Sequence, residues 1–112
     1  MRSVEVIKQA GRWAEPDATG ATYAEHFATA DLSVGTYSIR AGATDTQSPH
    51  SEDEIYVVTK GRARFTSDND TVAVEPGTVL FVPAKEGHRF HDITEDLVLL
   101  VFFGPAYGTR AE

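Results

Sequence analysis

The stretch SPHSEDEIYVVTKG, residues 48–61, changes character halfway along its length. His50 and Glu54 stand with two further acidic residues within five positions, and an apolar run at 55–58 follows at once. A short β-branched run of this kind predicts a buried strand. The polar cluster in front of it has two interpretations. It is either a solvated turn or half of a metal site, since first-row metals take imidazole and carboxylate ligands.

Short apolar and β-branched runs also make up the rest of the chain. Turn signals such as SDND, EPG and PAKEG separate them, at the spacing of roughly 8–12 residues that is typical of a sandwich or barrel. Only segments 6–14 and 16–18 have room for a helical turn. We therefore expect an all-β fold, an antiparallel β-barrel or jelly roll with little helix. The further predicted strands are residues 4–7, 22–28, 32–39, 63–65, 71–74, 78–82, 88–93 and 97–103.

Length and composition restrict the class of protein. The chain has 112 residues, which predicts a single domain over residues 1–112. Its formal net charge of −7 argues against nucleic acid and against membrane surfaces as partners. The absence of cysteine excludes disulfides and thiolate ligands, and it suits a cytoplasmic location. The longest apolar run, residues 97–103, is much shorter than the ~18 residues of a membrane span.

The histidines favour the metal interpretation if two strands are neighbours. His50 precedes one strand, and His88 opens another strand directly after the PAKEG turn. His91 lies three residues further on, so the two-residue period of a strand turns it to the opposite face. We expect His91 at the rim or on the outside, and His26 as an ordinary sheet residue.

Other polar and aromatic residues have simpler expected roles. Glu52 and Asp53 are expected in a solvated turn, with orientation of a metal-bound histidine as the alternative. Trp13 is expected to pack on a neighbouring surface of the protein. The aromatic residues expected in the core and the pocket wall are Tyr37, Tyr56, Phe81, Phe90, Phe102 and Phe103.

The spacing of these residues resembles the cupin superfamily, a group of small β-barrels marked by two motifs. The first motif matches residues 42–61, from Gly42 through His50 and Glu54 to Gly61. Ser48 stands where the family has its first histidine. The second motif matches residues 77–92.

The second motif begins at Gly77 and passes through Pro83 to His88. Lys85 replaces the second glycine of the family pattern, and Asp92 replaces its asparagine. The 15 residues between the motifs, 62–76, are a usual separation for cupins. The resemblance implies a single cupin domain in which His50, Glu54 and His88 bind one divalent transition metal (Fe, Mn, Ni, Cu or Zn).

The fourth ligand position has two candidates. A neutral hydroxyl such as that of Ser48 is a poor ligand, whereas the neighbouring Gln47 offers an amide oxygen. Strand alternation turns Gln47 away from the site unless Pro49 marks a bulge. A cupin subgroup with a similar Q-x-P-H-x-x-D-E pattern favours Gln47 as a ligand. The alternative is that Gln47 caps or bonds the turn.

The resemblance implies a small metal-dependent enzyme that acts on a small organic molecule. Similar one-domain cupins include dioxygenases, isomerases, cyclases and decarboxylases, and they are commonly homodimers. The sequence assigns no catalytic residue beyond the metal ligands. The alternative is a non-catalytic module that binds a small molecule, and a storage role ranks third. Metal content after purification separates the first two hypotheses.

Overall fold

The computed structural model describes residues 4–45, 49–68 and 70–108, and the described residues contain eight β-strands and no helix. No helix in this part of the chain has the length and hydropathy of a membrane span. The strands are β1 (Ala21–Ala28), β2 (Ser33–Ile39), β3 (Asp53–Lys60), β4 (Ala63–Ser67), β5 (Asp70–Val74), β6 (Val79–Val82), β7 (His88–His91) and β8 (Leu97–Gly104).

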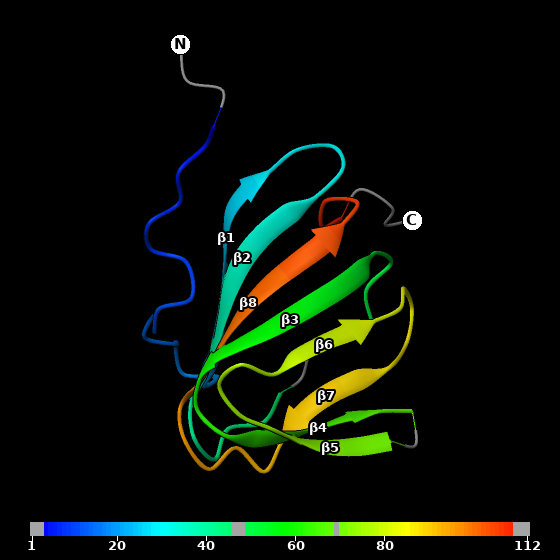
Figure 1. Cartoon of the computed structure of the whole chain (residues 1–112). Coiled ribbons are helices and arrows are strands. Elements are labelled where there is room, and N and C mark those ends of the chain that lie inside the picture. Colours follow the sequence, from blue (N-terminus) through cyan, green and yellow to red (C-terminus); the bar gives the residue numbers. More distant parts are fainter. Residues whose placement is uncertain (1–3, 46–48, 69, 109–112) are drawn as a thin grey trace.

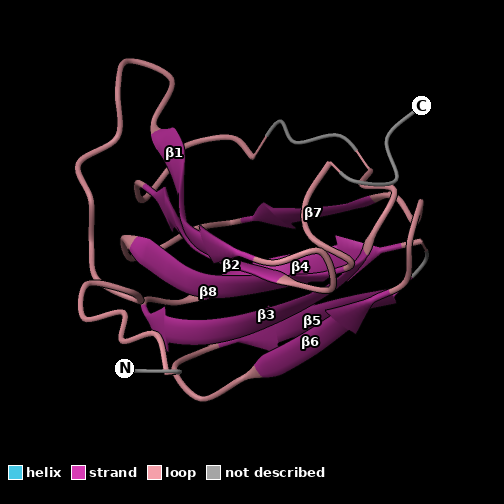
Figure 2. Cartoon of the chain, turned by 90° about the horizontal axis from the view of Figure 1, so that it is seen from above, coloured by secondary structure: helices cyan, strands magenta, loops and turns pink. Residues whose placement is uncertain are grey.

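The strands form two antiparallel sheets (Figure 1). The larger sheet has the order β1-β2-β8-β3-β6, and the smaller has the order β5-β4-β7. Seen from above, strands and loops surround a common interior (Figure 2), which is filled by side chains from both sheets. The two sheets are not closed into one barrel. The all-β, jelly-roll-like fold expected from the sequence is therefore confirmed in its two-sheet form.

Strand β8 supplies the centre of the core because it lies between β2 and β3 and alternates strictly. Leu97, Leu99, Val101 and Phe103 point into the shared interior and are at most 3% exposed. This is the two-residue period of a strand with one face on the core. Because β3 is the antiparallel neighbour of β8, its own alternation carries Glu54, two residues before the core residue Tyr56, to the same interior.

The predicted strand at residues 4–7 is wrong. This segment has no strand pairing in the described structure, and Val4 remains 66% exposed. The arm that follows it lies on the outer face of the larger sheet through bonds to side chains. Gly11 N–H donates to Thr36 Oγ1 (2.9 Å), and Ala14 N–H donates to Ser38 Oγ (3.2 Å). Trp13 Nε1–H donates to the carboxylate of Glu15 in the same arm.

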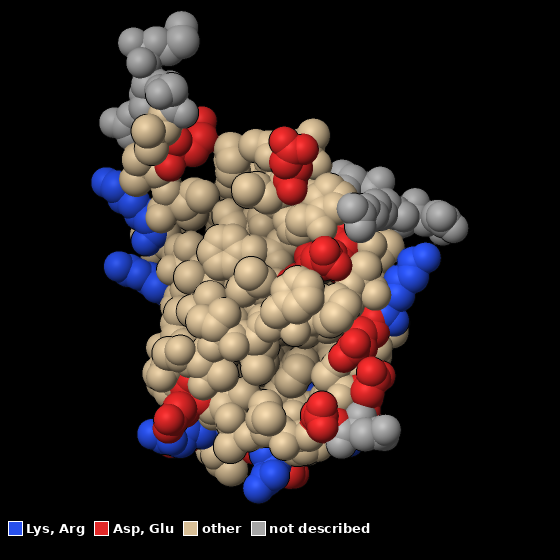
Figure 3. Space-filling model, turned by 45° about the vertical axis from the view of Figure 1, so that its right-hand side comes forward, with Lys and Arg blue, Asp and Glu red and all other residues tan. Residues whose placement is uncertain are grey.

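Two of the aromatic residues expected in the core lie instead on the outer face of the larger sheet. Phe81 on β6 is 63% exposed and Phe102 on β8 is 38% exposed, and both are cross-strand partners of Ile55. Their positions in the alternation place them opposite to the core residues of the same strands. Figure 3 shows a broad face dominated by uncharged side chains, with basic groups at its margins and acidic groups from its upper middle down its right-hand side.

The glycine that ends the first motif has a backbone reason for its identity. Gly61 connects β3 to β4 with φ of 93°, a region that other residues rarely adopt. A Cβ at this position would lie 2.3 Å from the carbonyl oxygen of Asp96. The glycine therefore lets the β3–β4 turn pass closely under the loop before β8.

Candidate metal centre

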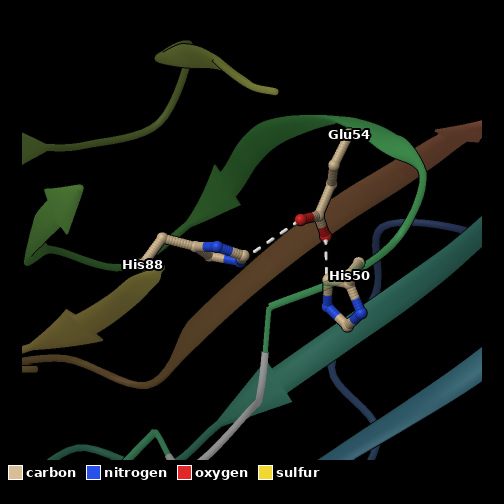
Figure 4. A group of neighbouring side chains, drawn as sticks. All are labelled: His50, Glu54 and His88. Carbon is tan, nitrogen blue, oxygen red and sulfur yellow. Dashed lines mark ion pairs between the residues drawn. The ribbon is translucent and has the colours of Figure 1, made fainter. Parts of the chain in front are cut away.

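Three side chains from separate parts of the chain meet inside the sandwich (Figure 4). His50 comes from the segment before β3, Glu54 from the start of β3, and His88 from the start of β7. One potential ligand atom from each residue lies within 4.8 Å of the others. His88 Nε2 is 3.3 Å from Glu54 Oε1, and His50 Nε2 is 4.0 Å from Glu54 Oε2.

The carboxylate of Glu54 is the most demanding group of this cluster. Its side chain is 2% exposed, and Oε1 has no hydrogen-bond partner among the described residues. An ionised carboxylate that is buried without a full set of partners costs several kcal/mol. A cation held between the three side chains would remove this cost. The two imidazoles and one carboxylate also form a donor set suited to divalent transition metals.

The imidazole of His88 is oriented by groups outside the cluster. Its Nδ1 lies 2.9 Å from the carbonyl oxygen of Glu86, which accepts a hydrogen bond from Nδ1–H. In that tautomer the lone pair of Nε2 faces Glu54, and the hydroxyl of Tyr56, 3.0 Å away, donates to it. The bond from Nδ1–H to the Glu86 carbonyl is typical of metal-binding histidines, because it fixes the tautomer and the ring orientation. The Tyr56 hydroxyl bonds to Nε2 itself, so a metal at Nε2 would displace this bond.

The two histidines differ in proton affinity. Burial of the imidazole lowers the pKa of His50, although Glu54 opposes the shift. Burial acts in the same direction on His88, but the nearby carboxylate of Glu54 and the hydrogen bond to the Glu86 carbonyl outweigh it and raise the pKa of His88. When Nε2 of His88 carries no proton, Glu54 Oε1 has no hydrogen-bond donor beside it. A proton on Nε2 would make His88 a cation and would give Glu54 Oε1 that donor. A metal at this position therefore competes with a proton mainly at His88.

Two further buried carboxylates surround His50. Asp45 is 5% exposed and Glu52 is 1% exposed. Both act with Glu54 against the burial that lowers the pKa of His50. The expectation that Glu52 lies in a solvated turn is therefore wrong, whereas Asp53 accepts a hydrogen bond from Ala84 N–H (2.9 Å) near the surface. Three carboxylates around two imidazoles give the site a negative potential that favours a divalent cation.

The remaining predicted residues have different outcomes. Gln47 and Ser48, the candidates for the fourth ligand position, lie outside the described residues. His91 faces away from the cluster and bonds through Nε2 to Thr66 Oγ1 (2.7 Å). His26 Nε2 lies 2.7 Å from Thr36 Oγ1 on the outer face of the larger sheet. The expectations for both histidines are confirmed.

A cavity of about 160 Å³ adjoins the cluster. All four tyrosines of the chain line it, although they come from β1, β2, β3 and the segment after β8. Tyr23 and Tyr107 carry no sequence signal that connects them with the site, because no local pattern reveals which strands are neighbours. The lining residues are Tyr23, Tyr37, His50, Glu54, Tyr56, Val101, Phe103 and Tyr107.

The sequence matches a family model described as a cupin domain over residues 35–103. It is also 45% identical over 92 residues to an uncharacterised protein of Streptomyces coelicolor. That match covers 82% of this chain and 88% of the relative. Both motifs noted in the sequence lie within the residues that the family model matches.

Two solved structures share the fold at low sequence identity. KdgF from Halomonas sp. has a TM-score of 0.72 at 22% identity, over 80% of this chain and 84% of KdgF. The DMSP lyase DddQ from Ruegeria pomeroyi has a TM-score of 0.73 at 19% identity, over 96% of this chain and 57% of the lyase. These likenesses show the fold and no more, since related folds serve many functions.

Proposed function

The chain belongs to the cupin domain family, and from this premise we propose that it is a small metal-dependent enzyme acting on a small organic molecule. The observation that carries the proposal is the buried carboxylate of Glu54, whose Oε1 has no hydrogen-bond partner in the described structure and faces His88. Structural carboxylates are normally satisfied by the protein. A carboxylate left unsatisfied between two histidines is typical of a site that holds a cation.

In this proposal His50, Glu54 and His88 hold one divalent transition metal of the series Fe, Mn, Ni, Cu and Zn. Such an ion, when bound, supplies Lewis-acid or redox chemistry to a molecule in the adjoining cavity. The protein's own contribution is to orient the ligand side chains and to exclude water from the cavity. The Glu86 carbonyl holds the His88 ring through Nδ1–H, and the aromatic walls keep the cavity apolar.

The reaction is proposed only as metal-dependent chemistry of the dioxygenase, isomerase, cyclase, decarboxylase or lyase type. The lyase class is included because the DMSP lyase DddQ shares the fold, at 19% identity to this chain. The alternative proposal, a non-catalytic module for a small molecule, is favoured by one observation. Beyond His50, Glu54 and the tyrosine hydroxyls, the lining of the cavity is entirely aromatic or aliphatic.

Elemental analysis of the purified protein tests the proposal. We expect stoichiometric transition metal, and we expect a chelator to lower the thermal midpoint, because a ligand that binds only the folded state stabilises it by mass action. Returning the metal should restore the midpoint. The contrary result is a purified protein that contains no metal, with a thermal midpoint that changes with neither chelator nor added metal ions. That result would exclude a metal enzyme and would leave the binding module as the function.

A homodimer and a cytoplasmic location complete the proposal. Ile55, Val79, Phe81 and Phe102 are exposed apolar side chains on the outer face of adjacent strands, and such patches are typical of interaction surfaces. The absence of cysteine suits the cytoplasm. Sedimentation should give twice the chain mass for the wild type and the mass of one chain for Phe81→Glu. A wild-type monomer at high protein concentration would contradict the dimer.

A further inference from the structure

The cavity beside the cluster of His50, Glu54 and His88 has an unusual chemical lining. It contains five aromatic rings of Tyr and Phe, and neither lysine nor arginine is among its lining residues. The charged groups near it are acidic: Glu54 lines the cavity, and the buried Asp45 bonds to Tyr37 in its wall. In the absence of a metal these carboxylates would repel an anionic ligand. The lining therefore favours a neutral molecule.

The volume of the cavity indicates the size of the molecule that it can hold. Its volume of about 160 Å³ is close to that of engineered apolar cavities of about 150 Å³ that bind benzene. Aromatic walls also favour edge-to-face contacts with a ring, as the pairs around Phe103 show. A single six-membered ring fits this space.

One buried hydroxyl in the cavity wall has no hydrogen-bond partner among the described residues. The hydroxyl of Tyr37 donates to Asp45 Oδ1 (2.8 Å), and that of Tyr56 bonds to His88 (3.0 Å). The hydroxyl oxygen of Tyr23 is buried, and the described residues offer it no hydrogen-bond partner. Burial also raises the pKa of Tyr23 well above its ordinary value, so this group is a neutral donor. A buried hydroxyl without a partner calls for an explanation.

The backbone beneath Tyr23 is shaped to admit this hydroxyl. Gly35 lies on the neighbouring strand β2, and a Cβ at Gly35 would lie 2.3 Å from the Tyr23 hydroxyl oxygen. Any other residue at this position would displace the tyrosine ring from its present place. Glycine within a strand weakens it and often marks a close approach of this kind. The Tyr23 ring thus lies against β2 at Gly35, and Tyr23 is one of the residues that line the cavity.

We infer that the cavity binds a neutral molecule of one-ring size that carries an oxygen atom, and that the Tyr23 hydroxyl donates a hydrogen bond to this oxygen. The inference names the substrate class of the metal site and in that respect rests on the proposed function. In this arrangement Tyr23 selects and orients the bound molecule. The part of the molecule that does not contact Tyr23 faces the cluster of His50, Glu54 and His88.

Binding of phenol and of benzene to chelator-treated protein tests the inference, because this measurement does not need the metal. Wild type should bind phenol more tightly than benzene. Tyr23→Phe should weaken phenol binding by about 3- to 10-fold, the ratio that corresponds to one neutral hydrogen bond. The same variant should bind benzene as tightly as wild type does, since benzene has no oxygen.

Two controls make the test specific to the hydroxyl of Tyr23. Tyr107→Phe alters another tyrosine of the same cavity wall and should leave the preference for phenol intact. Gly35→Ala should lower the preference as Tyr23→Phe does, because the added methyl group displaces the Tyr23 hydroxyl. Benzoate should bind more weakly than phenol to the chelator-treated protein, since the nearby carboxylates repel it.

The results separate the inference from the proposed function. Failure of wild type to bind phenol, an equal loss of phenol and benzene in Tyr23→Phe, or tighter binding of benzoate would each overturn the inference. Stoichiometric metal together with any of these results would leave the metal enzyme standing with another substrate class. The expected phenol pattern in a protein that takes up no metal would support the binding module instead.

Discussion

Replacing His88 by alanine is expected to abolish stoichiometric metal binding, whereas replacing His91 by alanine is expected to leave it intact. The two histidines lie on the same strand, β7, and differ in the face that they occupy. His88 Nε2 is 3.3 Å from Glu54 Oε1, while His91 Nε2 bonds to Thr66 Oγ1. His91→Ala is therefore a matched control for the loss of an imidazole from this strand.

The expected loss of affinity is large. Changes that only affect the groups around a metal ligand cost about 10- to 100-fold in affinity, so removal of a ligand should cost more than about 100-fold. Metal at 100 times its dissociation constant stabilises the folded state by about 2.7 kcal/mol. For a domain of this size that corresponds to roughly 10 °C in the thermal midpoint. His88→Ala should lose this metal-dependent increment and His91→Ala should keep it.

Metal analysis and thermal midpoints with and without chelator measure both effects. Equal metal content in the two variants, at the wild-type level, would show that the metal is held elsewhere in the protein. If both variants lost the metal to the same degree, the two faces of β7 would not differ as described. A substitution of Glu54 by glutamine, which keeps the volume but removes the charge, should resemble His88→Ala.

Replacing Asp45 by alanine is expected to give the largest loss of stability of any single change outside the apolar core. Asp45 is 5% exposed and joins the two sheets through its two carboxylate oxygens. Oδ1 accepts a hydrogen bond from the Tyr37 hydroxyl on β2, and Oδ2 accepts one from Phe90 N–H on β7, each at 2.8 Å. Alanine would leave the buried Phe90 N–H and the partly buried Tyr37 hydroxyl without their acceptor.

Each buried donor left without an acceptor costs about 1–3 kcal/mol, so Asp45→Ala should lower the free energy of unfolding by about 2–5 kcal/mol. The thermal midpoint should fall by roughly 10 °C or more. Asp45→Asn keeps an acceptor for one donor and should lose about half as much. Asp53→Ala, which removes a single bond near the surface, is the control and should cost about 1 kcal/mol or less.

Chemical denaturation of the three variants measures these free energies. Equal stabilities of Asp45→Ala and Asp53→Ala would mean that the bridge between the sheets contributes little. An Asp45→Asn variant as unstable as Asp45→Ala would place the whole effect in the negative charge. The first result contradicts the bridging role, and the second assigns it to electrostatics.

The strands were predictable because their signals are local. The continuous apolar run of segment 97–103 identified β8, and the turn sequences marked the ends of its neighbours. The failures occurred where the environment outweighed the pattern. Residues 4–7 are β-branched, yet the arm meets the sheet through side chains instead of a strand ladder. Phe81 and Phe102 are aromatic, yet their place in the alternation turns them outward.

The candidate site was predictable in part, and for a different reason. His50, Glu54 and His88 occur at spacings that resemble a known family, and the structure brings their ligand atoms within 4.8 Å of one another. Glu52 stands beside them in the sequence with the same side chain as Glu54 but was expected in solvent. Glu52 is only 1% exposed in the folded chain. This burial depends on the tertiary structure around the segment before β3, and no local sequence pattern indicates it.

The amino-acid sequence by itself determined the all-β class, the turns, the acidic charge and the three candidate ligands, because each rests on nearby residues or on fixed spacing. Only the tertiary structure decided which residues surround those ligands. Tyr23 and Tyr37 become partners through the register of β1 on β2. Asp45 reaches Phe90 across 45 positions of the chain. Sheet order and register arise from the packing of the whole core, so contacts of this range have no local signal.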